Sequence, residues 1–207
     1  MSLIAENLFL CNSFLVLAQV SKFLSILKTM KREPERNGHL WFSVFLARIV
    51  SKFLSNVLRK NGETVPGRLL LLLRESAIQD LSKGKRVSLV SGTNGKSSTT
   101  RAVVRSISTL GKTSTSHSGS NLHWGIATAL MSDSDFAVLE VDELHLSRII
   151  EETKPESVVL LNLTRDQLHR MHEVKRVADR WHDGASQARE TTFIIDVDDP
   201  FLNYATK

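Results

Sequence analysis

The chain has 207 residues, of which 42% are hydrophobic and 24% are charged, with a formal net charge of +5 and a pI near 9.5. This composition is typical of a folded globular protein and excludes disorder of the whole chain. The one cysteine, Cys11, excludes an internal disulfide and a cysteine-rich metal site, and fits a cytoplasmic protein. The basic charge does not indicate nucleic-acid binding, because the sequence has no basic stripe with interleaved aromatic residues and no zinc-finger spacing.

Residues 1–60 are predicted to form a helical amino-terminal extension. The apolar run 3–27 is interrupted by polar residues and has no basic leader or cleavage site, which favours an amphipathic helix over a membrane span or a secretory signal. A second helix is predicted from Trp41 to Leu58. Both helices could pack on the core of the protein or lie on an anionic membrane surface, where the lysines and arginines near their ends would face the lipid. Residues 1–29 are expected to be dispensable for folding, because a polar linker follows Met30.

From residue 61 to residue 207 the sequence alternates between strand and helix patterns and predicts one domain. NGETVPG at 61–67 is predicted to be a turn-rich linker. The fold class expected is α/β, a mainly parallel sheet with helices on both faces, and ligands bind such sheets beyond the carboxyl ends of the strands. Strands are predicted at about 86–91, 136–141, 157–163 and 192–196, and helices at about 69–82, 97–110, 124–131, 143–152 and 172–188.

The stretch LVSGTNGKSSTT at 89–100 joins the first predicted strand to a helix. It resembles a phosphate-binding loop, although Val90 stands where the usual pattern has its first glycine. Gly92 and Gly95 allow backbone amides to approach a ligand, and Lys96 adds a positive charge at a helix amino terminus. Ser97 is placed to offer a hydroxyl to Mg²⁺. The alternative interpretation is a glycine turn with an exposed lysine.

Polar residues also follow the next two predicted strands. In EVDE at 140–143, Glu140 is a candidate magnesium ligand, whereas Glu143 is more simply explained as the start of the next helix. In NLTRDQLHR at 162–170, the side chains expected to face the same crevice are Asn162, Asp166 and Gln167. His169 and His172 are possible metal ligands, but solvent-exposed histidines at a helix start are the commoner case.

Five motifs in this order resemble the central ATP-binding domain of the Mur ligase family: GTNGKSST at 92–99, SGSNLHWG at 118–125, EVDE at 140–143, NLTRDQL at 162–168 and DVDDP at 196–200. The resemblance extends over about 41–207. That family shortens the phosphate loop to G-[TS]-N-G-K-[TS], which accounts for Val90. The DQ of NLTRDQL most resembles the branch of the family that amidates lipid II.

The resemblance implies an ATP-dependent amide-forming ligase of peptidoglycan synthesis, with ATP and Mg²⁺ as cofactors. A carboxylate, the α-carboxyl of D-glutamate in lipid II, would be activated as an acyl phosphate and converted to D-isoglutamine with ammonia from a GatD-like glutamine amidotransferase partner. The location implied is the cytoplasm, at the inner face of the membrane. The resemblance assigns the catalytic role to Lys96, Glu140 and Asp166, magnesium to Ser97 and Glu140, and the nucleotide to Gly92, Thr93, Asn94, Gly95, Lys96, Ser97, Ser98, Asn162 and Asp196.

The sequence departs from the family pattern at three points. Asp196 stands where the family usually has an asparagine near the nucleotide, and His169 replaces a usual aspartate. Lys207 precedes the four-cysteine zinc ribbon and the carboxy-terminal domain that the resemblance would lead one to expect, so this chain alone is not expected to amidate lipid II. Two alternatives stay open: a catalytically silent ATP-binding module, and another ligase such as a folylpolyglutamate synthase, which Gln167 and the VADRWH segment at 177–182 disfavour.

Overall fold

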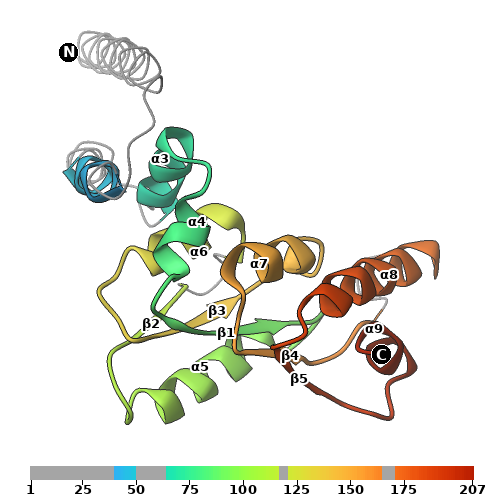
Figure 1. Ribbon diagram of the computed structural model, residues 1–207. Coiled ribbons are helices and arrows are strands. Elements are labelled where there is room, and N and C mark those ends of the chain that lie inside the picture. Colours follow the sequence, from blue (N-terminus) through green and yellow to red (C-terminus); the bar gives the residue numbers. More distant parts are fainter. Residues whose placement is uncertain (1–39, 50–63, 117–120, 165–170) are drawn as a thin grey trace, which may run out of the picture. The chain divides into compact units, whose positions relative to one another are not determined.

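The computed structural model describes residues 40–49, 64–116, 121–164 and 171–207 (Figure 1). Several predicted features lie outside the described residues: the helix predicted at 3–27, the domain boundary at residue 60, the side chains of Asp166, Gln167 and His169, and that of His172. In the described part of the chain, no helix has the length and apolar character that a membrane crossing requires.

Five parallel strands form one sheet in the order β2-β3-β1-β4-β5. The predicted α/β class with a mainly parallel sheet is confirmed. The sequence did not predict β2, because its residues Thr, Ser and Thr lack the apolar character of a buried strand; it pairs with β3 at the edge of the sheet. The strands are β1 (Arg86–Ser91), β2 (Thr113–Thr115), β3 (Phe136–Glu140), β4 (Ser157–Leu160) and β5 (Thr192–Ile195).

Helices cover both faces of this sheet, with α5 on one face and α4, α6 and α7 on the other (Figure 1). Residues 40–49 form a further helix within the described part of the chain. The labelled helices are α3 (Val65–Leu73), α4 (Ala77–Ser82), α5 (Lys96–Ile107), α6 (His123–Leu130), α7 (Leu146–Thr153), α8 (Met171–Gln187) and α9 (Pro200–Ala205).

The helix predicted at 69–82 is two helices, α3 and α4, and the predicted linker ends inside the first of them. Pro66 occupies the first turn of α3, where its missing amide costs nothing. Gly67 is buried against α6, and a Cβ at this position would come within 1.8 Å of the carbonyl oxygen of Trp124. The glycine therefore permits close packing of α3 on α6, a tertiary reason that no local pattern reveals.

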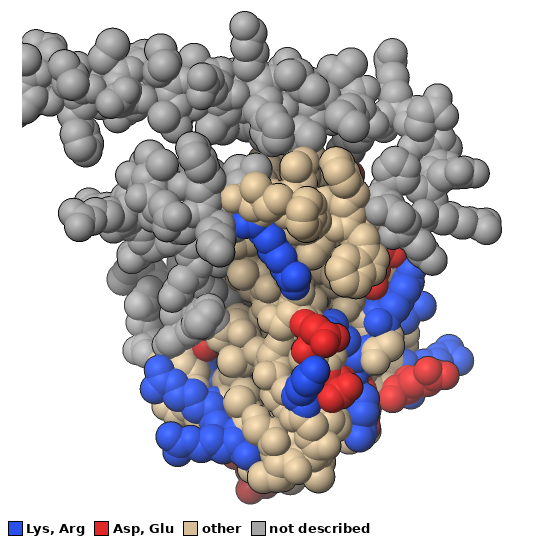
Figure 2. Space-filling model, turned by 90° about the vertical axis from the view of Figure 1, so that its left-hand side faces the viewer, with Lys and Arg blue, Asp and Glu red and all other residues tan. Residues whose placement is uncertain are grey.

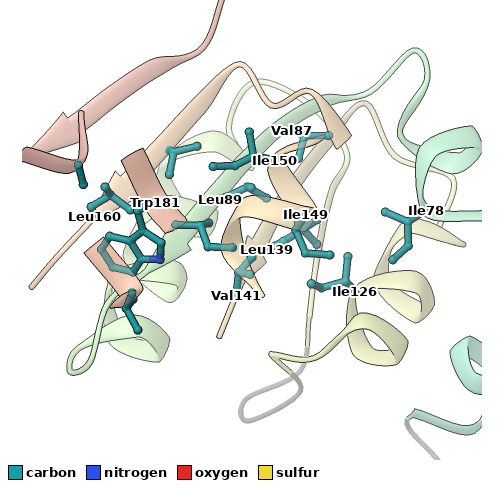
Figure 3. Close-up of a cluster of buried hydrophobic side chains, with 14 of the residues drawn as sticks. Ile78, Val87, Leu89, Ile126, Leu139, Val141, Ile149, Ile150, Leu160 and Trp181 are labelled. Atoms are coloured by element: carbon teal, nitrogen blue, oxygen red, sulfur yellow. The ribbon is translucent and has the colours of Figure 1, made fainter. Parts of the chain in front are cut away.

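The core lies between the sheet and the helices on the α7 side (Figure 3). Leu89 of β1 and Leu139 of β3 are fully buried, and Ile149 of α7 packs against the same cluster. Trp181 of α8 is 1% exposed, and its indole N–H donates to the carbonyl oxygen of Glu143 at 2.8 Å. This bond satisfies the one polar atom of a buried indole and fixes the turn after β3, close to the candidate site.

Candidate nucleotide site

The loop between β1 and α5 requires glycine at two positions. Gly92 and Gly95 have φ angles of 141° and 85°, in the range that side chains with a Cβ rarely adopt. A Cβ on Gly92 would also come within 3.0 Å of the backbone nitrogen and oxygen of Asn162. The loop therefore lies directly against the chain that follows β4.

Asn162 holds this loop with its backbone and its side chain. Its carbonyl oxygen accepts from the amide of Thr93 at 2.9 Å, and its Oδ1 accepts from the amide of Asn94 at 2.9 Å. Its Nδ2 donates back to the carbonyl oxygen of Asn94 at 3.1 Å. The amide of Thr164 adds a bond to the Thr93 hydroxyl at 3.0 Å. In this arrangement Asn162 positions the loop, so the amides that remain for an anion are those of the first turn of α5, which have no acceptor within the helix.

Lys96 is the first residue of α5, and its side chain is folded back over the loop. Its Nζ donates to the carbonyl oxygens of Gly92 and Thr93, the latter at 3.1 Å, and to Oε2 of Glu143 at 3.2 Å. The side chains of Lys96 and Glu143 are 13% and 20% exposed. The ammonium group is thus held at the helix amino terminus by oxygen atoms that a bound phosphate group would compete with.

Glu143 was explained from the sequence as the start of the next helix, and this was wrong, because α7 begins at Leu146. Glu143 lies in the turn before α7, whose backbone is tied to Trp181. It is the one residue in this group that the sequence analysis left outside the site. The signal that could have found it is its place three residues after Glu140, in a turn at the carboxyl edge of the sheet.

Ser97 and Glu140 meet across the neighbouring ends of β1 and β3. The register pairs Val90 with Glu140, so the end of β3 lies beside the start of the loop. The Ser97 hydroxyl donates to Oε2 of Glu140 at 2.8 Å, and Glu140 is only 4% exposed. The amide of Glu140 also donates to the Ser116 hydroxyl at 3.1 Å, which fixes the end of the strand.

The pair of Ser97 and Glu140 fits Mg²⁺ in its chemistry. A hydroxyl and a carboxylate are hard oxygen ligands, and Mg²⁺ is usually held by one or two protein ligands together with water and phosphate oxygens. The described residues contain no group of three or more histidine, cysteine, aspartate or glutamate side chains that could enclose a metal ion. With a hydroxyl and one carboxylate as protein ligands, the pair suits a Mg²⁺ ion that also binds phosphate oxygens and water.

A cavity of about 380 Å³ opens beside this pair, between α5 and the ends of β2 and β3. Its volume is within the range of small-molecule sites. Its charged side chains are two arginines of α5 and Glu140. The cavity is lined by Ser97, Thr100, Arg101, Val104, Arg105, Thr115, Ser116 and Glu140.

The comparison with protein families agrees with this geometry. Residues 90–207, more than half of the chain, match the model of the Mur ligase middle domain. The chain belongs to the Mur ligase family.

Two relatives in this family are similar to the chain over most of its length. The MurT subunit of the glutamine-hydrolyzing lipid II isoglutaminyl synthase of Streptococcus pneumoniae is 33% identical over 148 residues, which are 68% of this chain and 33% of that protein. The MurT subunit of the same synthase of Staphylococcus aureus is 25% identical over 169 residues, 79% of this chain and 38% of that protein. The chain thus spans about a third of the length of these relatives.

Solved Mur ligases share the fold. MurF of Acinetobacter baumannii superposes with a TM-score of 0.55 at 18% identity, over 67% of this chain and 33% of that chain. The MurF ligase of Thermotoga maritima in complex with ADP gives a TM-score of 0.54 at 16% identity, over 71% of this chain and 35% of that chain. At these identities the likeness shows a Mur ligase fold alone.

The remaining residues predicted for this Mur ligase site are Ser98, Asp196 and Asp166. Ser98 is exposed on the first turn of α5. Asp196 follows β5, which β4 separates from β1, and its Oδ1 accepts from the amide of Asp198 at 3.0 Å. Within the described part of the chain, no hydrogen bond joins Asp196 to the loop. Asp166 lies outside the described part of the chain. The roles predicted for Ser98, Asp166 and Asp196 stay predictions.

Proposed function

We propose that this chain is the nucleotide-binding part of an ATP-dependent ligase of peptidoglycan synthesis. The observation that supports the proposal best is the hydrogen bond between Ser97 and Glu140, at the amino terminus of α5 and next to Lys96. A helix amino terminus with a lysine and a hydroxyl–carboxylate pair is suited to a triphosphate bound with Mg²⁺. Membership of the Mur ligase family and the ADP complex of the T. maritima MurF ligase support the same ligand.

Each group in the site has a task in this proposal. Ser97 and Glu140 would hold Mg²⁺, which when bound neutralises charge on the phosphate oxygens. Lys96 would leave Glu143 and donate to the transferred phosphoryl group, where developing charge is concentrated. Gly92 and Gly95 allow the backbone to approach the phosphates, and Asn162 keeps the loop in place.

The finer part of the proposal concerns the acceptor, and it rests on the MurT relatives. A carboxylate oxygen of lipid II, on the α-carboxyl of D-glutamate, would attack the γ-phosphorus of ATP, and ADP would leave with the electrons of the broken P–O bond. Ammonia from a glutamine amidotransferase of the GatD type would then attack the acyl carbon, phosphate would leave and D-isoglutamine would form. A cytoplasmic location beside the inner face of the membrane belongs to this proposal, as does a zinc site in any downstream polypeptide.

Two measurements test the coarse and the fine part separately. Calorimetry with Mg-ATP should show saturable binding, and its absence would contradict a nucleotide function. For the acceptor, the chain is assayed together with a GatD-type amidotransferase and any downstream polypeptide, because this chain alone is not expected to amidate lipid II. In this assay lipid II should raise the rate of ADP release, whereas lipid II already amidated at the D-glutamate α-carboxyl should not. Equal rates with both lipids would contradict the choice of this carboxyl while leaving nucleotide binding intact.

A further inference from the structure

The helix over residues 40–49 exposes an unusually apolar face. Trp41 is 76% exposed, and Phe42, Phe45 and Ile49 are 52%, 58% and 50% exposed. Val44 and Ala47, which lie on the other side of the same helix, are 7% and 0% exposed. A surface helix normally turns polar residues outward, so a helix that is apolar on both sides has a second surface to cover. The four exposed residues are called here the apolar helix face: Trp41, Phe42, Phe45 and Ile49.

A second exposed apolar group occurs on α3. Leu72 is 64% exposed, and it lines a cavity of about 520 Å³ together with Arg68, Leu71 and Trp124. The guanidinium of Arg68 lies 4.5 Å from the centre of the Trp124 ring. Figure 2 shows that the upper part of the described surface is largely uncharged, whereas charged side chains gather below it.

The charge of the surrounding sequence indicates what covers the apolar helix face. Residues 37–62 contain four basic residues and no aspartate or glutamate, while Glu35 and Glu63 flank this stretch. The basic residues are Arg48, whose guanidinium donates to the carbonyl oxygen of Met131, and Lys52, Arg59 and Lys60, which lie outside the described residues. The apolar helix face thus belongs to a stretch of sequence whose charged residues are all positive. Such a stretch is complementary to a layer with an apolar interior and negatively charged groups at its border.

We propose that the apolar helix face docks this protein on an anionic lipid bilayer. Tryptophan and phenylalanine favour the boundary between headgroups and acyl chains, and lysine and arginine are attracted to anionic headgroups. A few inserted aromatic side chains give reversible attachment. The inference rests on the membrane location in the proposed function and deepens it, but it uses no residue of the nucleotide site, so vesicle binding and Mg-ATP binding can fail separately.

The test is cosedimentation of the full chain with two kinds of vesicle, phosphatidylcholine alone and phosphatidylcholine mixed with phosphatidylglycerol. The wild type should sediment with the mixed vesicles and be released by salt, because the headgroup attraction is screened. The double variant Phe42→Ser, Phe45→Ser should have an affinity for these vesicles that is lower than that of the wild type by roughly tenfold or more. The matched control is Ile194→Ser, Val197→Ser, which removes two apolar side chains that are 52% and 67% exposed elsewhere; it should bind as the wild type does.

Three results would overturn the inference. The first is no binding of the wild type to the mixed vesicles. The second is binding that the Phe42→Ser, Phe45→Ser variant retains while its thermal melt matches the wild type, because another segment would then provide the attachment. The third is a dimer, seen by light scattering, that this variant abolishes while vesicles are not bound, because a second copy of the chain would then cover the apolar helix face.

Discussion

The chain after β1 and the chain after β5 are both turns at the carboxyl edge of the same sheet, yet they are built differently. The loop after β1 is fixed by residues distant in sequence, since Asn162 bonds its amides and Glu140 bonds Ser97. The turn after β5 is fixed by its own residues, since Asp196 accepts from Asp198, and Asp199 caps α9 by accepting from the amides of Phe201 and Leu202. The candidate site lies at the strand end that other strand ends surround.

The cause of this difference is the strand order. β1 lies in the middle of the sheet between β3 and β4, so two other strand ends adjoin its loop. Val90 and Ser91 at its end are 0% exposed. β5 is an edge strand, and Ile194 is 52% exposed. Residues of similar chemistry therefore form the candidate nucleotide site at one end and local structure at the other.

The largest effect expected is that of Lys96→Ala at the central loop. A charged hydrogen bond to phosphate contributes roughly 1.5–3 kcal/mol, so the Kd for Mg-ATP should rise roughly ten- to a hundredfold. Calorimetry measures the change, and Lys112→Ala, a lysine whose side chain is 74% exposed, is the matched control. Equal affinities of the wild type and Lys96→Ala would mean that the loop is an ordinary glycine turn.

The next effect concerns the metal. Glu140→Gln keeps an oxygen that can accept from the Ser97 hydroxyl but removes the negative charge, so the affinity for ATP in the presence of Mg²⁺ should fall about tenfold. ATP without magnesium should bind at least as well as to the wild type, because a buried negative charge near the phosphates is gone. Glu151→Gln, at an exposed position on α7, is the control. A loss that is the same with and without Mg²⁺ would assign Glu140 to the loop structure and not to the metal.

The sequence predicted the loop between β1 and α5 and the acidic residue at the end of β3, because the signals for both are local. A strand pattern, two glycines, a lysine and a serine in series identify the loop, and an acidic residue at the end of an apolar run identifies Glu140. What was missed depends on contacts between distant segments. Gly67 is needed because α6 lies against it, the hydroxyl-rich β2 is a strand because β3 pairs with it, and Glu143 joins the site because Lys96 folds back toward it.

A smaller effect of opposite sign is expected for Glu143→Gln. Glu143 competes with phosphate for Lys96, so a neutral glutamine should release the lysine more easily and tighten Mg-ATP binding. A partly exposed ion pair contributes up to about 1 kcal/mol, which corresponds to at most about fivefold in Kd. Calorimetry at low and high salt should show the gain shrinking as the pair is screened. Weaker binding in this variant would instead make Glu143 a group that orients Lys96 in the bound state.

The smallest effect is expected at the end of β5, where Asp196→Asn leaves an Oδ1 that can still accept from the amide of Asp198. Its Kd for Mg-ATP should therefore stay within about twofold of the wild type, because the substitution changes only an exposed charge two strands away from the loop. Asp199→Ala is the reference for this turn. Loss of the α9 cap should lower the free energy of unfolding by about 1 kcal/mol, measured by denaturant titration, and leave the Kd unchanged. A tenfold gain in affinity with Asp196→Asn would show that this carboxylate faces the nucleotide, and that the end of the edge strand belongs to the same site as the end of the central one.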